Sequence, residues 1–272
     1  MAQHFRGALG SILLTSVITG GSFGLCFGQA AYKAPRTADG KPSLNGIWQA
    51  MNEANYDLEG HAARAGQSIE MGAWAAEPGG LGVVEGGTIP YLPAALEQKK
   101  KNFAGRMKLD PEVKCYLPGI PRATYQGFPF QIVEGPQYIL MAYEFAGAMR
   151  SIYMKDPGPA PTDSWMGQSV GHWEGEALVV DTKGFNDQTW FDRAGDFHSD
   201  QLHVIERFTA TSPVTLNYEA TIEDPQTFSR PWKISMPLYK RQEKNMQLLE
   251  FKCVEFVEEL MYGHLRKKPA TK

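Results

Sequence analysis

The chain has 272 residues, of which 43% are hydrophobic and 21% are charged, and its formal net charge is −3. This ordinary globular composition provides enough apolar material for one large core or two small ones. Because no basic field is present to gather phosphates, the composition argues against a nucleic-acid partner.

The N-terminus has the layout of an export signal. Residues 8–27 form an apolar stretch softened by glycines, and Gly28-Gln29-Ala30 supplies a small-x-small cleavage site. We therefore predict a signal peptide over residues 1–30 and a mature protein that is periplasmic or secreted, with no stable membrane anchor. An uncleaved membrane anchor is the alternative, which the glycines disfavour.

Export changes the interpretation of the cysteines. Removal of Cys26 with the signal peptide leaves Cys115 and Cys253. In an oxidising compartment these two can form a disulfide, which closes a long loop and contributes on the order of 4 kcal/mol. The alternative is two separate buried thiols. The chain has no Cys/His spacing typical of a structural zinc site.

Residues 31–126 are irregular. Prolines and glycines interrupt this region, and only residues 58–74 and 93–107 have helical patterns. We predict a segment that wraps around another domain rather than one that folds alone. Its one distinctive piece, Gly46-Ile47-Trp48, resembles the Gly-x-Trp opening of lipocalin-type barrels.

Residues 127–272 have the pattern of short strands separated by turns. The predicted strands cover residues 128–133, 138–145, 150–154, 165–173, 177–182, a segment from 202, 215–222, 232–239 and 248–254. The hairpin-length links predict an antiparallel meander, since parallel neighbours need a dozen or more connecting residues. A meander of this length closes into a barrel or curls into two packed sheets. We favour a mainly β fold, a lipocalin- or calycin-like barrel that holds a ligand in its mouth, with the N-terminal segment covering one end.

Residues 184–207 interrupt this pattern with an unusual density of reactive side chains. Most of this stretch forms a link of about twenty residues between two strands, where neighbouring links have only a few. Four aromatic residues within it, Phe185, Trp190, Phe191 and Phe197, favour a compact, ordered loop. A long ordered loop at a barrel mouth commonly carries site residues.

Acid-base chemistry is the favoured interpretation of this loop. A histidine can act as acid or base near neutral pH, a carboxylate can orient it, and an arginine can stabilise an oxyanion. The predicted catalytic residues are His198, His203, Asp192, Arg193 and Asp200. His198 is the preferred catalyst, and we predict that His198→Ala abolishes turnover without loss of the fold.

Two other interpretations of the loop remain open. His198, Asp200 and His203 resemble a two-histidine, one-carboxylate iron site, although residue 203 has the opposite strand parity. In the structural alternative, the charged residues pair with neighbours and the histidines cap turns. No nucleotide or phosphate motif is present, and we predict no metal and no cofactor.

Substrate contacts are predicted at Arg122 and Tyr125, which lie in a stiff, proline-rich stretch before the strands. Trp165 and Trp190 are predicted to line an apolar pocket. The alternatives are an ion pair of Arg122 with a carboxylate, and packing of the aromatic side chains in the core.

Four long motifs cover much of the mature chain: TADGKPSLNGIWQ, DPEVKCYLPGIPRATY, WEGEALVVDTKGFNDQTWFDRAGDFHSDQLHVIERF and YEATIEDPQTFSRPWK. They resemble a largely uncharacterised family of exported bacterial proteins. This resemblance implies a link to catabolism of plant-derived aromatic compounds, including formaldehyde-releasing lyases that act on phenylcoumaran-type lignin dimers. We therefore expect a cofactor-independent lyase for a small hydrophobic, aromatic molecule. The alternatives are a lipocalin-like binding protein and a metal-dependent hydrolase or oxygenase.

Overall fold

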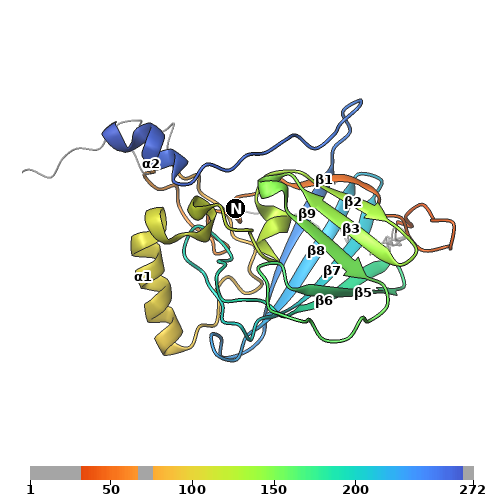
Figure 1. Ribbon diagram of the computed structural model, residues 1–272, viewed down its shortest axis with the longest axis horizontal. Helices are drawn as coiled ribbons and strands as arrows, with labels where there is room; N and C mark the ends of the chain where they lie inside the picture. Colours follow the sequence, from red (N-terminus) through yellow and green to blue (C-terminus); the bar gives the residue numbers. More distant parts are fainter. Residues whose placement is uncertain (1–31, 67–75, 266–272) are drawn as a thin grey trace, which may run out of the picture. The chain divides into compact units, whose positions relative to one another are not determined.

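The computed structural model describes residues 32–66 and 76–265. Within them, nine strands hydrogen-bond side by side and form one closed barrel (Figure 1). The strands are β1 (Gly46–Ala50), β2 (Phe130–Glu134), β3 (Tyr138–Tyr143), β4 (Met149–Tyr153), β5 (Gln168–Glu174), β6 (Ala177–Lys183), β7 (His203–Ser212), β8 (Thr215–Glu223) and β9 (Trp232–Lys240). The predicted mainly β barrel is confirmed. The predicted signal peptide lies outside the described residues.

The first strand comes from the N-terminal segment, which we expected only to cover the barrel. β1 pairs with β2 through Trp48 and Phe130, and with β9 through Ala50 and Leu238. A closed sheet needs both of its edges paired, and β1 fills the position between them. The barrel therefore begins before residue 127, and residues 248–254 form no strand.

One neighbouring pair is parallel, contrary to the predicted all-antiparallel order. β4 and β5 pair through Ile152 with Ser169 and through Tyr153 with Val170. The link of residues 154–167 is longer than a hairpin turn, which allows the chain to return to the start of the first strand before it enters the second. The strand predicted to begin at residue 165 begins at Gln168, so the link was underestimated.

The inside of the barrel is filled by alternate side chains of each strand. On β8, Leu216, Tyr218, Ala220 and Ile222 are fully buried, while the residues between them are partly exposed. This is the period-2 pattern of a strand with one core face and one wet face.

The part of the N-terminal segment that follows β1 and the loop of residues 184–202 cover one end of this barrel (Figure 1). The described helical elements are α1 (Pro93–Leu109), η2 (Pro111–Lys114), η3 (Arg122–Tyr125), η4 (Phe145–Gly147), α2 (Val257–Tyr262) and η5 (Gly263–Leu265). The predicted helix at 93–107 corresponds to α1, which starts with proline at its first turn, where no backbone donor is needed. The described residues of the other predicted helix, 58–66, are not helical.

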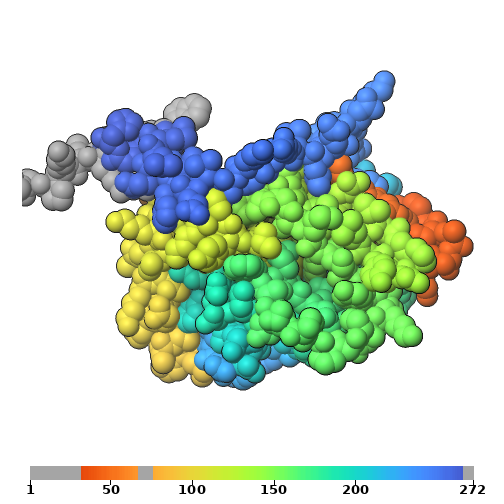
Figure 2. All heavy atoms as spheres, viewed as in Figure 1, coloured from red at the N-terminus to blue at the C-terminus, as the bar shows by residue number. Residues whose placement is uncertain are grey.

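A disulfide joins Cys115 to Cys253, with 5.6 Å between the two Cα atoms, which is one of the two alternatives considered from the sequence. It fixes the segment that follows β9 to the outside of the molecule, where this segment runs over the surface towards α2 (Figure 2). The ring of Phe251 packs there against Phe128, with 5.1 Å between centroids. None of the described helices is long and apolar enough to span a membrane.

Candidate functional site

The loop of residues 184–202 is ordered by its own aromatic side chains, as predicted. Trp190 pairs with Phe197 in an isolated β-bridge, and the Phe191 amide donates to the Asp196 carbonyl at 2.6 Å. Phe185 and Phe191 are buried in the core. Because the loop joins the end of β6 to the start of β7, it closes one end of the barrel.

His198 is enclosed within this loop. Its Nε2 lies 2.6 Å from the Thr189 hydroxyl and its Nδ1 lies 2.8 Å from the Ser199 carbonyl oxygen. A carbonyl oxygen only accepts, so Nδ1 carries the proton and Nε2 accepts from Thr189 in the neutral ring. Burial lowers the pKa of His198, because the charged form is poorly solvated there. With both nitrogens occupied, the ring serves to hold the loop together.

Asp192 is also committed to the loop backbone. Its Oδ1 accepts from the Ala194 amide at 2.9 Å and the Asp196 amide at 3.1 Å, and its Oδ2 accepts from the Leu58 amide at 2.9 Å. These bonds tie the loop to the N-terminal segment. Burial, with Asp196 and Asp57 nearby, raises the pKa of Asp192 well above its usual range.

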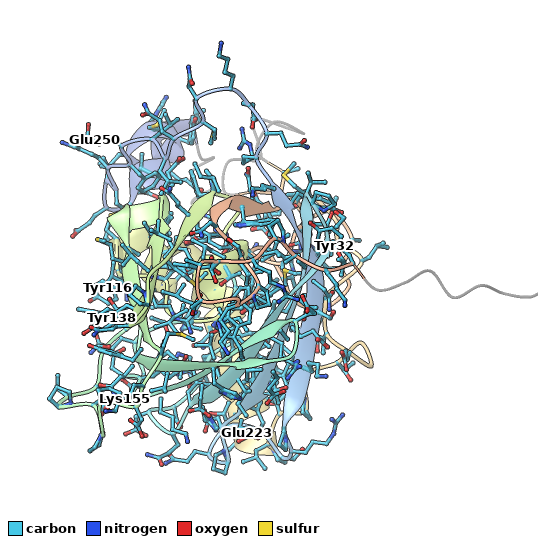
Figure 3. The ribbon with its side chains drawn as sticks, turned by 90° about the vertical axis from the view of Figure 1, so that its right-hand side faces the viewer. Tyr32, Tyr116, Tyr138, Lys155, Glu223 and Glu250 are labelled. Carbon is cyan, nitrogen blue, oxygen red and sulfur yellow. A yellow bond between two sulfur atoms is a disulfide. The ribbon has the colours of Figure 1, made fainter. Side chains whose placement is uncertain are left out.

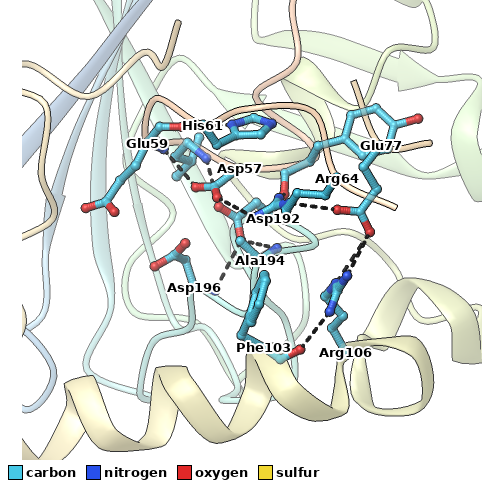
Figure 4. Close-up of polar contacts among 12 residues, drawn as sticks. Asp57, Glu59, His61, Arg64, Glu77, Phe103, Arg106, Asp192, Ala194 and Asp196 are labelled. Carbon is cyan, nitrogen blue, oxygen red and sulfur yellow. Dashed lines mark hydrogen bonds and ion pairs between the residues drawn. The ribbon is translucent and has the colours of Figure 1, made fainter. Parts of the chain in front are cut away.

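These three aspartates form one buried acidic cluster (Figure 4). One ligand oxygen of each lies within 4.8 Å of the others, the one such group with metal-ligand spacing in the described part of the chain. Two side-chain cations already face it: Arg64 Nη1 lies 3.1 Å from Asp57 Oδ2, and Lys99 Nζ lies 3.5 Å from Asp196 Oδ2. We interpret the cluster as an ion network that joins α1 and the N-terminal segment to the loop.

His203 and Asp200 lie away from His198. His203 is partly exposed on the outer face of β7, with Nε2 2.7 Å from Asp181 Oδ2 and Nδ1 3.0 Å from Glu223 Oε2. Asp200 is exposed and accepts from Gln201. The structure therefore does not assemble His198, Asp200 and His203 into the metal set considered from the sequence.

Arg193 also has partners of its own. It donates to Glu258 Oε1 at 2.9 Å and lies over the Tyr56 ring, 5.7 Å from its centroid. The five predicted catalytic residues thus face different partners, and the loop does not bring them to one cavity. The physical reason is that a compact loop satisfies its own buried polar groups first.

The predicted substrate contacts are mostly structural too. Arg122 is 1% exposed and pairs with Asp110 at 2.8 Å and Glu112 at 2.6 Å, which agrees with the ion-pair alternative. Tyr125 is fully buried and donates to the Phe191 carbonyl at 2.9 Å. These contacts pack η3 and η2 against the end of the barrel.

The two predicted tryptophans occupy different surroundings. Trp190 is 9% exposed and belongs to the loop. Trp165 lies in the link before β5, where its ring is 5.8 Å from the Tyr116 ring and its buried Nε1 has no hydrogen-bond partner. Neither lines the mouth pocket described below.

A second group of charged side chains lies inside the barrel. Arg150 on β4 and Glu206 on β7 form an ion pair, with side chains 1% and 0% exposed. Arg150 Nη1 donates to Glu206 Oε1 at 3.2 Å, Nε donates to Ser169 at 2.7 Å, and Nη2 donates to Thr182 at 2.8 Å. Tyr218 on β8 donates to Glu206 Oε1 at 2.9 Å. Five strands therefore contribute to this interior cluster.

The edge of the interior cluster is incompletely satisfied. Tyr143 on β3 donates to the sulfur of Met141 at 3.6 Å, and its hydroxyl also interacts with Arg150 and Thr124. Both polar atoms of the Gln126 side chain are buried without a hydrogen-bond partner. Burial raises the pKa of Tyr143 and of Tyr218, so both phenols keep their protons at neutral pH.

This arrangement is costly for a purely structural core. Desolvating a buried ion pair can cost more than its attraction returns, and apolar replacements are often neutral or stabilising. Each unpaired buried polar atom costs a further ~1–3 kcal/mol. A perturbed, polar constellation inside an apolar barrel is therefore a candidate functional site.

A mouth pocket lies at the barrel end opposite the loop. Its volume is about 550 Å³, which falls in the range of small-molecule sites. Its inward-facing floor consists of Ile139, Met154 and Trp173, and polar side chains, including His172 and Glu134, stand at its rim. Figure 3 faces this end of the barrel and shows side chains filling the ring of strands.

β3 connects the mouth pocket to the interior cluster. Ile139, Met141 and Tyr143 are successive buried residues on its inward face. Residues two apart on a strand are separated by about 7 Å. Met141 therefore stands between the pocket floor at Ile139 and the hydroxyl of Tyr143.

Sequence reasoning missed the interior cluster, although one signal was present. In β7 the inward positions Val204, Glu206 and Phe208 alternate with partly exposed residues. A charged residue in an otherwise apolar inward row needs a buried partner. The same argument applies to Arg150 beside Ile152 on β4, but only the fold shows that the two strands face each other.

Comparison of the chain with protein-family models, with curated proteins and with solved structures gives no match.

Proposed function

We propose that the protein is an acid-base lyase that admits a small aromatic molecule through the mouth pocket and cleaves it at the interior cluster. One observation carries the proposal. A carboxylate, a guanidinium and two protonated phenols, those of Glu206, Arg150, Tyr143 and Tyr218, meet inside an apolar barrel. These groups supply a base, a cation and acids without requiring a further redox group.

The reaction we propose is loss of a hydroxymethyl group as formaldehyde. A base removes the alcohol proton, and the oxygen electrons form the carbonyl bond of formaldehyde while the carbon–carbon bond breaks. The released electron pair forms a new carbon–carbon double bond and expels a neighbouring aryl ether oxygen, which then takes a proton. Atoms and electrons balance, with no net oxidation.

Each step has a matching group in the interior cluster. Glu206 is positioned to act as the base, since a carboxylate can accept the alcohol proton. Arg150 stabilises negative charge on the departing aryl oxygen, and Tyr143 donates the proton to it. The apolar surroundings strengthen these interactions, because the local dielectric constant is low.

A binding protein without turnover is the second candidate. It is favoured by the mouth pocket alone, since Ile139, Met154 and Trp173 provide an apolar floor in a cavity large enough for a ligand of one or two rings. In that case the interior cluster would contribute to the structure of the barrel and not to catalysis.

The experiment uses purified protein and phenylcoumaran-type dimers, with formaldehyde and the unsaturated product measured together. We expect product formation by the wild type and a loss of at least about a hundredfold in Glu206→Gln, the effect typical of removing a general base. Asp200→Asn is the matched control, because this exposed carboxylate lies outside the cluster.

Two results would contradict the lyase proposal. One is tight binding of the dimers without any product, which supports the binding protein. The other is wild-type turnover by a folded Glu206→Gln variant, which removes the interior carboxylate from the chemistry.

A further inference from the structure

Met141 occupies an unusual place in the interior cluster. Its sulfur accepts from the Tyr143 hydroxyl at 3.6 Å and faces Arg150 Nη1 at 3.9 Å. The side chain is 1% exposed, so water does not compete for these donors. Two strong hydrogen-bond donors therefore converge on one thioether.

Among the N–H groups of Arg150, only one faces a sulfur atom. A guanidinium has five N–H groups. Four of them donate to oxygens of Ser169, Thr182 and Glu206, which accepts two. The remaining N–H is the one that faces the sulfur of Met141.

A thioether is a weak acceptor for such donors. The sulfur therefore satisfies the Tyr143 hydroxyl and the last N–H of Arg150 less well than an oxygen would, although these two groups also interact with each other. An oxygen at the sulfur position would satisfy both.

Met141 is also able to move. Methionine is unbranched, with three rotatable bonds, and it adapts readily to irregular spaces. Its neighbour on the same face of β3, Ile139, lines the mouth pocket. A ligand that enters from the mouth meets the thioether before it meets Tyr143.

We infer that the sulfur of Met141 holds the place of a ligand oxygen. An uncharged hydroxyl or ether oxygen, carried by an apolar ring that enters through the mouth pocket, displaces the thioether and accepts from Tyr143 Oη and Arg150 Nη1. This oxygen subsite rests on the proposed function and adds the group that aligns the substrate within it.

Two substitutions of Met141 have opposite expected effects. Met141→Leu keeps the volume and removes the competing acceptor, and such swaps are usually tolerated in cores. Met141→Gln supplies an amide oxygen at similar reach, which satisfies both donors and blocks the subsite.

The probes are 2-methoxyphenol, which carries the oxygens, and toluene, which has a similar ring without them. Titration calorimetry measures their affinities, and methyl-labelled methionine resonances report on Met141, assigned by its absence in Met141→Leu. We expect 2-methoxyphenol to shift the Met141 resonance. We also expect its affinity to be equal to or stronger than that of the wild type in Met141→Leu, and at least about fivefold weaker in Met141→Gln, since one ordinary hydrogen bond is worth about fivefold.

Tyr143→Phe provides a test that leaves Met141 in place. It should weaken 2-methoxyphenol about fivefold and leave toluene unchanged, because only the hydroxyl is lost. The subsite is refuted if both Met141 substitutions alter the two probes equally, or if 2-methoxyphenol binds without moving the Met141 resonance.

Failure of the subsite and failure of the lyase proposal are distinguishable. The expected pattern of probe affinities without any turnover of dimers contradicts the lyase alone. Turnover of the dimers that is indifferent to Met141→Gln contradicts the oxygen subsite alone.

Discussion

Asp192 in the loop and Glu206 in the barrel are both fully buried carboxylates, but their partners differ in kind. Asp192 accepts from three backbone amides, which cannot be replaced by a ligand without unfolding the loop. Glu206 accepts from the side chains of Arg150 and Tyr218, within a cluster that has poorly satisfied donors at its edge. Burial alone therefore does not identify a site. The kind of partner, backbone or side chain, separates a structural carboxylate from a candidate catalytic one.

The largest expected effect comes from breaking the interior ion pair. Arg150→Met leaves Glu206 as an unpaired buried charge and should lower the free energy of unfolding by about 3–5 kcal/mol. The double variant Arg150→Met/Glu206→Leu should recover most of this loss, because an apolar pair removes the desolvation cost. Urea denaturation measures both. A double variant as unstable as the single one would show that the pair is structural, like Asp192.

Loss of the disulfide has the second largest expected effect on the free energy of unfolding. Replacing both Cys115 and Cys253 by serine should lower the free energy of unfolding by about 4 kcal/mol, because the cross-link no longer restricts the unfolded chain. Probe binding at the mouth should persist in buffer without denaturant, since the bridge joins segments outside the barrel. Thermal unfolding and titration calorimetry on the same sample check this, and wild-type affinity lost together with the bridge would contradict it.

Substitution of Asp192 measures how much the structural carboxylate contributes to the free energy of unfolding. Asp192→Ala leaves three buried amides without an acceptor and should cost ~1–3 kcal/mol. Asp192→Asn should cost less, since one amide oxygen can keep the bonds from Ala194 and Asp196.

The raised pKa of Asp192 predicts how its contribution to stability changes with pH. The pKa of Asp192 is raised in the folded state, so its contribution to stability is full below about pH 3.8 and is lost as pH rises through the folded pKa. The free energy of unfolding of Asp192→Asn should therefore improve relative to wild type as pH rises from 4 to 8. Parallel pH profiles of the two proteins would argue against a raised pKa.

Substitution of His198 has the smallest expected effect on stability. Its pKa is lowered in the folded state, so its contribution to stability is present above about pH 6.5 and is lost as pH falls, by up to about 1.4 kcal/mol per pH unit. Replacing the ring in His198→Gln should flatten the stability profile between pH 6.5 and 5. Dimer turnover should persist in any folded His198 variant, in contrast to the expectation from sequence. Complete loss of turnover in a stable variant would return His198 to the mechanism.

Much of the fold was predictable because strands carry their own signal. The alternation from Leu216 to Ile222 predicted a strand with one buried face, and β8 has this pattern. The helix α1 was predicted from its helical pattern. The parallel pairing of β4 with β5 was not predicted, since strand order depends on contacts between residues far apart in sequence.

The candidate site was much less predictable. The loop was correctly predicted to be ordered by aromatic side chains, but its charged residues were taken for chemistry, and most have structural partners. His198 illustrates the difference, because the hydrogen bonds of its ring are with Thr189 and Ser199 and not with its sequence neighbours Asp196 and Asp200. Proximity in sequence does not determine which side chains meet across a turn.

The sequence by itself determined that this chain makes short strands in number sufficient for a barrel and that the loop is ordered. These properties follow from local periodicity and composition. Only the tertiary structure decided that β1 closes the barrel and that Arg150 meets Glu206 beneath the mouth pocket. The two residues lie 56 positions apart, and their meeting depends on strand register and on which face of each strand turns inward. Local sequence constrains the face of each strand, but closure of the whole barrel sets the partner.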